Sequence, residues 1–412
     1  MALIAVWLPA LGVPFRGFLD FSAFYVAAQF AFTPDVVRLD PIVLAQDAAG
    51  LPISPYLYTP LFALLFVPLS WLPYQLAGLV NLALMFGALL VASILIARLY
   101  GLSRRIAIVS ALAWSPAAAS VLSGQNASFG LVLVVVIGIL MLWAESMASP
   151  RSAIAAGLTL SLLAYKPQFA LPVVGLALLR ERWLVVATVI VGLIGHYLLA
   201  AAVAGGNLAW PVDWLTTLTR YSAVDLETNG WQAISLPALL ARVPISLLGE
   251  NAPAGLQGLA PVGYALATLV IVLCVPAMRR MPLPRALALA ACLGLLIMPH
   301  AWVYNATLLL PALAVLAVDA WRRGWPWQDR WLFAAIYAIG LVWPLGRLVG
   351  VTLLPIIVIA MPALLVGWGP FRRSQPAGSS RRPFSAGSGT GTASSDPPPA
   401  RRRSATADPA RR

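Results

Sequence analysis

Runs of apolar residues separated by short polar or basic breaks extend along most of this chain. A helix needs about 20 predominantly apolar residues to cross a bilayer, and several runs approach that length. We therefore expect about twelve transmembrane helices, with soft boundaries because some runs are shorter than a bilayer. Their expected positions are residues 1–14, 76–99, 106–123, 128–144, 153–166, 168–179, 184–203, 262–278, 286–299, 301–318, 331–346 and 349–368.

Composition supports the same class of protein. Of the 412 residues 61% are hydrophobic and only 10% are charged, whereas a soluble domain is about half apolar and about a quarter charged. The sequence thus predicts an all-α polytopic membrane protein. The two cysteines, Cys274 and Cys292, lie within apolar runs and are interpreted as small core residues rather than a disulfide or a metal pair.

The positive charge of the chain predicts its orientation in the membrane. The segment 371–412 carries nine Arg and two Asp, so seven of the thirteen net positive charges lie there. Most of the others lie in short breaks between apolar runs, which is typical of cytoplasmic loops and not of nucleic-acid binding. We expect a multi-pass protein of the inner (plasma) membrane with both termini in the cytoplasm.

If the basic loops are all cytoplasmic, successive spans alternate in direction, and two further apolar runs are then expected not to cross the membrane. Residues 58–73 and 234–248 are each interrupted by proline, which removes backbone donors and suits re-entrant or interfacial helices beside a cavity. The predicted extracytoplasmic loops then include 15–57 and 205–261. We expect one transmembrane domain over 1–370 and a disordered cytoplasmic tail over 371–412, rich in Arg, Ser, Gly and Pro, with a solvated tail favoured over one that contacts anionic lipids.

The beginning of the chain leaves two alternatives open. The first apolar run has neither a basic flank nor a small-residue cleavage site, so no cleavable signal peptide is expected. The run 1–14 is also short for a span. Either the first helix is short or the natural start lies upstream.

Two charged side chains are the first candidates for chemistry. Asp20 is the first acidic residue of the chain and lies six residues after the end of the first apolar run; a carboxylate near a membrane-buried end costs free energy and is by default functional. Lys166 is the only lysine and lies at a predicted outer turn, where a compact cation suits a phosphate. The alternative for Lys166 is an anchor whose ammonium reaches the lipid headgroups.

Polar side chains at two other predicted outer turns extend the candidate site. Gln125 and Asn126 carry amides that suit sugar hydroxyls or a phosphate, although Asn126 also suits a helix N-cap. His300 lies at a turn on the same predicted side as Asp20, with a structural histidine as the alternative. His196 lies in the middle of a predicted helix and is interpreted as structural packing.

Aromatic residues of the outer loops are candidates for a substrate groove. We assign Tyr25, Tyr58, Trp231 and Gln232 to it, with an interfacial aromatic belt as the alternative for the rings. The chain has no GxxxxGK phosphate-binding motif, no Asp-x-Asp pair and no His/Cys cluster with metal spacing. We therefore expect no ATP-driven pump, no nucleotide-sugar site, no metal and no cofactor.

Taken in order, these segments resemble those of a known family. The early Asp20, the Tyr58-Thr59-Pro60-Leu61 segment, Gly124-Gln125-Asn126 and Tyr165-Lys166-Pro167 resemble glycosyltransferase family 87, the polyprenol-phosphate-mannose-dependent mannosyltransferase-like proteins. The resemblance covers most of residues 15–320. The sequence departs from it at Thr59, where proline is expected.

The resemblance implies an architecture and a reaction. It implies a GT-C-like helical bundle that moves a sugar, mannose or another hexose, from a polyprenyl-phosphate donor to a lipid or glycan acceptor. It implies that Asp20 is the general base, that Lys166, Gln125 and Asn126 hold the donor, and that His300 lies near a phosphate. A single displacement would invert the anomeric configuration.

Two other functions are consistent with a bundle of about twelve spans. A lipid-linked oligosaccharide transporter or polymerase would share the polar cavity, but transporters commonly show internal repeats, and we find no convincing repeat between the halves. A membrane protein without catalysis would leave the outward clustering of the polar candidates unexplained.

Overall fold

The computed structural model describes residues 6–7, 19–248 and 258–367, except that the side chains of 222–227 and 243–248 are not described. Contacts group Met1–Phe371 as one unit and separate Arg372–Arg412 from it. The predicted first span falls almost wholly outside the described residues, as does the predicted disordered tail. Within the described part the fold is all-helical, and the only β-type pairing there is an isolated antiparallel bridge between Ala233 and Trp302.

Five stretches are helical, long and apolar enough to cross a membrane, and each lies over a predicted span. They are α7 (Tyr74–Tyr100), α10 (Ala127–Ser146), α13 (Trp183–Val203), α17 (Ala260–Arg280) and the continuous stretch Val303–Arg322, which is formed by η6 (Val303–Leu309) and α19 (Leu310–Arg322).

Two further candidates are bent pairs. The helices α8 (Arg104–Ala113) and α9 (Ser115–Ser123) meet at 69°, and α20 (Trp327–Leu341) is followed at 46° by the segment Trp343–Val349, which contains η7 (Trp343–Leu345) and α21 (Gly346–Val349). Counting each pair as one span gives seven candidates among the described residues. The predicted number of about twelve therefore stays a prediction.

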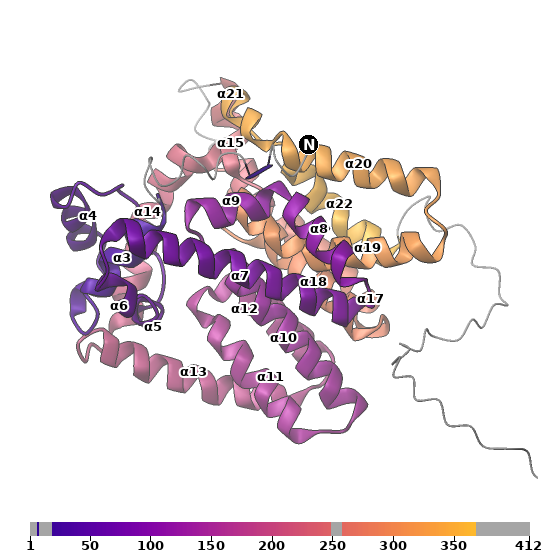
Figure 1. Ribbon diagram of the computed structural model, residues 1–412, viewed down its shortest axis with the longest axis horizontal. Helices are drawn as coiled ribbons and strands as arrows, with labels where there is room; N and C mark the ends of the chain where they lie inside the picture. Colours follow the sequence, from indigo (N-terminus) through magenta and orange to yellow (C-terminus); the bar gives the residue numbers. More distant parts are fainter. Residues whose placement is uncertain (1–5, 8–18, 249–257, 368–412) are drawn as a thin grey trace, which may run out of the picture. The chain divides into compact units, whose positions relative to one another are not determined.

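Shorter helices complete the apolar bundle. They are α11 (Pro150–Leu162), α12 (Pro167–Leu179), α18 (Leu283–Ile297) and α22 (Leu354–Val366). The helix α11 packs between α10 and α13 (Figure 1), and α18 packs against α12, α17 and α22. Most residues of α10 and α18 are buried, whereas most residues of α13 and α17 are at least partly exposed, as expected of helices that face lipid.

The predicted outer loops contain helices of their own. The first loop contains α3 (Phe21–Gln29), η2 (Pro34–Val37) and α4 (Leu39–Ala48), and the long second loop contains α14 (Trp210–Asn229), η4 (Gly230–Gln232) and α15 (Leu236–Leu248). The proline-broken run 58–73 forms α5 (Pro60–Leu64) and α6 (Val67–Ser70), because each proline starts a new short helix. Whether these segments are re-entrant stays a prediction.

The helices α10 and α12 place the polar candidate residues at one end of the bundle and charged residues at the other. The helix α10 begins beside Asn126 and ends beside Glu145, and α12 begins after Lys166 and ends beside Arg180. A helix rises about 1.5 Å per residue, so the 20 residues of α10 separate its ends by about 30 Å. We call the end with Asn126 and Lys166 the site end, and the end with Arg180 the arginine end.

Candidate functional site

Asp20 is fixed at the site end by its own backbone. It occupies the N-cap position of α3, and its N–H donates to the carbonyl oxygen of Ser123 at 3.0 Å. Its half-buried carboxylate accepts a hydrogen bond from the Ser54 hydroxyl at 3.2 Å. Gln46 in turn donates to the carbonyl of Ser54 at 2.9 Å. The carboxylate is therefore held by three segments that the chain brings together only on folding.

The turn that carries the two amides depends on a glycine. Gly124 ends α9 with φ +83°, and a Cβ there would lie 2.9 Å from the Cβ of Phe21. Left-handed backbone conformation and lack of space both favour glycine. Asp20 and Phe21 can thus lie directly against the backbone that precedes Gln125.

A stack of aromatic rings carries the hydroxyls that meet these amides. The rings of Tyr58 and Tyr165 pack nearly parallel against Phe62, at centroid distances of 5.1 and 4.3 Å. The hydroxyl of Tyr58 donates to Oε1 of Gln125 at 3.0 Å, and that of Tyr165 donates to Oδ1 of Asn126 at 3.4 Å. The amide carbonyls are therefore occupied by tyrosines.

Lys166 lies among aromatic rings and is only 7% exposed. Its Nζ donates to Oδ1 of Asn305 at 3.2 Å and lies 4.9 Å from the ring centre of Phe169, 5.3 Å from that of Tyr304 and 5.6 Å from that of Tyr58. Ring faces attract a cation, most strongly when it is desolvated. The ammonium is thus inside the protein, which excludes the alternative of a headgroup anchor.

Electrostatics connect the carboxylate with this lysine. Burial lowers the pKa of Lys166 to about 7, and the negative charge of Asp20 acts in the opposite direction. Burial raises the pKa of Tyr58, and Asp20 raises it further. The carboxylate therefore lies close enough for its charge to act on both groups, although they are far apart in sequence.

Two buried amide nitrogens at this place have no acceptor among the described residues. They are Nδ2 of Asn126 and Nδ2 of Asn305, whose side chains are at most 1% exposed. A buried donor without an acceptor costs about 1–3 kcal/mol. With Lys166 they form a set of donors able to satisfy an oxyanion. Within the described part of the chain, no three His, Cys, Asp or Glu side chains come together as metal ligands would.

The remaining predicted residues lie apart from this cluster. The ring of Trp231 stacks on Trp343 at 5.7 Å, with Gln232 next to it, and the ring of His300 packs edge-on against Trp302 at 5.9 Å. The bridge between Ala233 and Trp302 joins these two segments. We call this the Trp231–His300 group; the segment Trp302–Asn305 connects it to Lys166.

Tyr25 is engaged in holding helices together. Its hydroxyl donates to the carbonyl of Leu72 at 2.9 Å, and its ring packs on Phe21 and Tyr74. These contacts fasten α3 to the segment that precedes α7. A role of Tyr25 in a substrate groove stays a prediction.

The second histidine contacts the segment that carries Tyr58. His196 is buried in α13, and its Nε2 lies 3.0 Å from Oγ1 of Thr59. This agrees with the structural interpretation of His196. Thr59, which departs from the expected proline, thus provides the polar partner of His196 next to Tyr58.

Sequence reasoning missed Asn305 and the roles of Tyr165 and Tyr304. Asn305 follows His300 in an otherwise apolar stretch and is completely buried. A lone amide between apolar neighbours is the signal that could have singled it out, because a buried amide needs partners. Nothing in the sequence indicates that its partner is Lys166.

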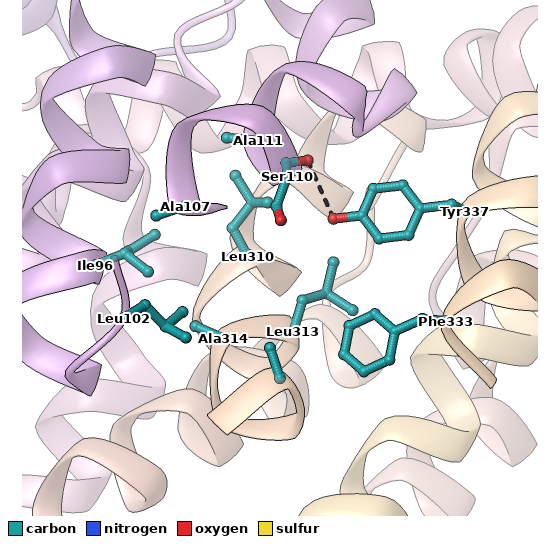
Figure 2. A pocket seen from close by; sticks show the side chains of 11 residues that line it. Ile96, Leu102, Ala107, Ser110, Ala111, Leu310, Leu313, Ala314, Phe333 and Tyr337 are labelled. Atoms are coloured by element: carbon teal, nitrogen blue, oxygen red, sulfur yellow. Dashed lines mark hydrogen bonds between the residues drawn. The ribbon is translucent and has the colours of Figure 1, made fainter. Parts of the chain in front are cut away.

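A small apolar cavity lies away from these residues. It encloses about 30 Å³ between α7, α8, α19 and α20, with Ser110 and Tyr337 as its polar neighbours (Figure 2). The Tyr337 hydroxyl donates to the carbonyl of Ser110 at 3.1 Å. The cavity has no charged lining residue and none of the predicted site residues, so its size carries no argument for the chemistry.

Comparison with protein families decides the assignment. The model of glycosyltransferase family 87 matches residues 56–299, more than half of the chain. The chain belongs to glycosyltransferase family 87. No curated protein and no solved structure matches it.

The family assignment gives the general activity and fits the described site in part. Membership makes the protein a glycosyltransferase, and the apolar helices make it one with membrane-embedded segments. The match includes Tyr58, Gln125, Asn126 and Lys166 and ends just before His300. Asp20 precedes it, so the position of this carboxylate beside the matched residues comes from the fold alone.

Proposed function

We propose that the protein transfers a hexose, such as mannose, from a polyprenyl-phosphate donor to a lipid or glycan acceptor at the site end. The observation that carries this proposal is that Asp20 and Lys166 meet the same short segments. Asp20 is hydrogen-bonded through its N–H to Ser123 beside the Gln125 turn. The buried ammonium of Lys166 lies 5.6 Å from the ring centre of Tyr58, whose hydroxyl donates to Gln125. The carboxylate can accept a proton, and the ammonium can balance the charge of a departing phosphate. Both contributions lower the barrier to glycosyl transfer from a lipid phosphate.

The proposed reaction is a single displacement. An acceptor hydroxyl attacks the anomeric carbon, Asp20 takes the hydroxyl proton, and the bond between the anomeric carbon and the phosphate oxygen breaks. The electron pair of that bond leaves with the polyprenyl phosphate. Attack opposite the leaving group inverts the anomeric configuration, and general-base assistance of this kind contributes about 10²- to 10⁴-fold.

The donor phosphate would be held by the buried donors. Lys166 and the free N–H groups of Asn126 and Asn305 point to a group that needs several acceptor oxygens. Donors preorganised in a site of low dielectric stabilise developing charge more than water does. Gln125 would act through Tyr58, to which it is hydrogen-bonded.

The Trp231–His300 group is assigned to the substrate groove beside this site. Aromatic faces suit sugar rings, and His300 lies on the same chain segment as Asn305. In this proposal the site end faces the extracytoplasmic side of the inner membrane, both termini are cytoplasmic, and the bundle is GT-C-like with about twelve spans. The concentration of arginine at the opposite end supports this orientation.

The test is transfer by the purified full-length protein from a radiolabelled polyprenyl-phosphate sugar to candidate lipid and glycan acceptors. The Asp20→Asn variant is expected to lose at least about 100-fold in transfer rate, because the amide cannot take the proton. Asp47→Asn is the matched control, since Asp47 is an exposed carboxylate at the end of α4.

Two results would contradict the proposal. Full transfer by Asp20→Asn would remove Asp20 as the base. Transfer from a nucleotide sugar, with none from a polyprenyl-phosphate sugar, would replace the donor class while leaving the family assignment unchanged. A transporter is the less favoured alternative, because the family is one of glycosyltransferases.

A further inference from the structure

An open cleft of about 280 Å³ lies at the arginine end, remote from the candidate site. It is lined by the turn between α12 and α13 and by the last turn of α17, with the residues Leu179, Arg180, Glu181, Arg182 and Arg279. Lys166 begins α12 and Arg180 follows its last residue. The 13 residues of α12 therefore separate this cleft from the ammonium of the candidate site by about 20 Å.

Two guanidinium groups of the cleft, those of Arg180 and Arg182, are held in place by other parts of the chain. Arg180 donates from its Nη2 to the carbonyls of Met278, at 2.9 Å, and of Met281. Arg182 pairs with Glu145 at 2.6 Å. Arg279 is exposed and forms no ion pair within the described part of the chain. Two of the three cations are thus preorganised, and the third is available to a ligand.

The charge of the cleft favours an anion. Glu145 compensates Arg182, and Glu181, exposed on the rim, offsets one further charge, so one positive charge remains. The N-terminus of α13 adds a partial positive charge directly after Arg182.

The surroundings of the cleft are apolar and face outward. Leu178, Trp183 and Leu184 flank it and are 43%, 63% and 42% exposed. They lie at the ends of two apolar helices, where tryptophan commonly marks the boundary between lipid and water. A ligand here would meet arginine at one end and hydrocarbon at the other.

We propose that the Arg180–Arg182–Arg279 cleft binds the phosphate of an anionic glycerophospholipid, whose acyl chains lie along the exposed side chains of α12 and α13. Planar guanidinium groups match the oxygens of a phosphate. The apolar flank favours this ligand over free phosphate, because free phosphate has no hydrocarbon chain that could contact the flank. The site would fix a lipid on the membrane face opposite the transfer site.

The proposal is tested with the purified full-length protein in a neutral detergent, titrated with fluorescent phosphatidylglycerol. Saturable binding is expected, with much weaker binding of fluorescent phosphatidylcholine. The Arg279→Ala variant is expected to bind phosphatidylglycerol about fivefold more weakly. This factor corresponds to the binding free energy that one arginine contributes near an anionic membrane surface. The Glu181→Gln variant is expected to bind it more tightly, because a like charge leaves the rim.

Arg151→Ala is the matched control, since Arg151 is exposed in the first turn of α11 at the same end but does not line the cleft. Its binding is expected to equal that of the unaltered protein. Equal loss in Arg151→Ala and Arg279→Ala would show a diffuse surface effect and overturn the proposal. So would equal binding of the two lipids, or displacement of phosphatidylglycerol by glycerol phosphate at the same concentration as by the lipid itself. Unchanged thermal unfolding of Arg279→Ala excludes loss of fold as the cause.

Discussion

Lys166 donates a hydrogen bond from its Nζ to Oδ1 of Asn305 at 3.2 Å, across 139 positions of sequence. The bond joins the turn between α11 and α12 to the helical segment η6, and both partners are buried. It gives a buried cation an acceptor that carries no charge. When Lys166 is protonated, its charge is therefore not neutralised by a carboxylate in direct contact and can act on a ligand.

Asn305 is predicted to set the position of Lys166. In Asn305→Leu the ammonium loses its acceptor while the branched shape of the side chain is kept, and a hydrogen bond to a charged group is worth about 1.5–3 kcal/mol. We expect the KM for the polyprenyl-phosphate donor to rise at least about tenfold, measured by initial rates at varied donor concentration. An unchanged KM would show that Asn305 serves packing only.

The pH dependence of donor binding is predicted to follow Lys166. Burial lowers the pKa of this group to about 7, so the folded protein loses the positive charge above pH 7 while the unfolded chain keeps it up to about pH 10.4. Donor binding should therefore weaken as pH rises through 7.

Stability should change in the opposite direction. Between pH 7 and about pH 10 the unfolded state binds more protons at this position, so the free energy of unfolding contributed by Lys166 rises with pH. The Lys166→Arg variant, which stays charged, should show neither trend. Thermal unfolding and donor titrations at several pH values measure both, and donor binding that is flat from pH 6 to 9 would argue against a phosphate role for Lys166.

The Tyr58 hydroxyl is predicted to matter more for transfer than that of Tyr100, which lies at the other end of α7. Tyr58→Phe leaves Oε1 of Gln125 without its buried donor, whereas Tyr100→Phe frees only the carbonyl of Pro284. Both variants lose one hydrogen bond, worth about 1 kcal/mol of stability. Only Tyr58→Phe should lower kcat/KM, by about tenfold in the transfer assay. Equal kcat/KM values for the two variants would place Gln125 outside the site.

Gly124 is predicted to be indispensable for the position of Asp20. Gly124→Ala combines a backbone at φ +83° with a Cβ 2.9 Å from Phe21, and a strained backbone position costs about 1–3 kcal/mol. We expect a lower unfolding temperature and reduced transfer. Gly87→Ala in α7, where an added Cβ meets nothing within 4 Å, is the matched control and should be neutral or slightly stabilising. Equal unfolding temperatures for the two variants would contradict the prediction.

Much of the candidate site could be chosen from the sequence, because membrane chains have few polar residues to choose among. A single lysine, an early aspartate and a pair of amides stood out against an apolar background, and Tyr58, Gln125, Asn126 and Lys166 do meet in the fold. Trp231 and His300 stood out for the same reason yet belong to a neighbouring group. The rarity of a polar residue in an apolar sequence identifies residues whose burial costs free energy. It does not identify the residues that they contact.

The sequence alone determined that the chain is helical, apolar and membrane-embedded, because composition and the length of apolar runs fix the solvent in which the helices must lie. It also determined the family, through the order of short motifs. Only the tertiary structure decided that Lys166 is enclosed by rings and bonded to Asn305, and that the first predicted outer loop contains α3, η2 and α4. These features depend on contacts between segments more than a hundred residues apart, which no local pattern of apolar and polar positions encodes.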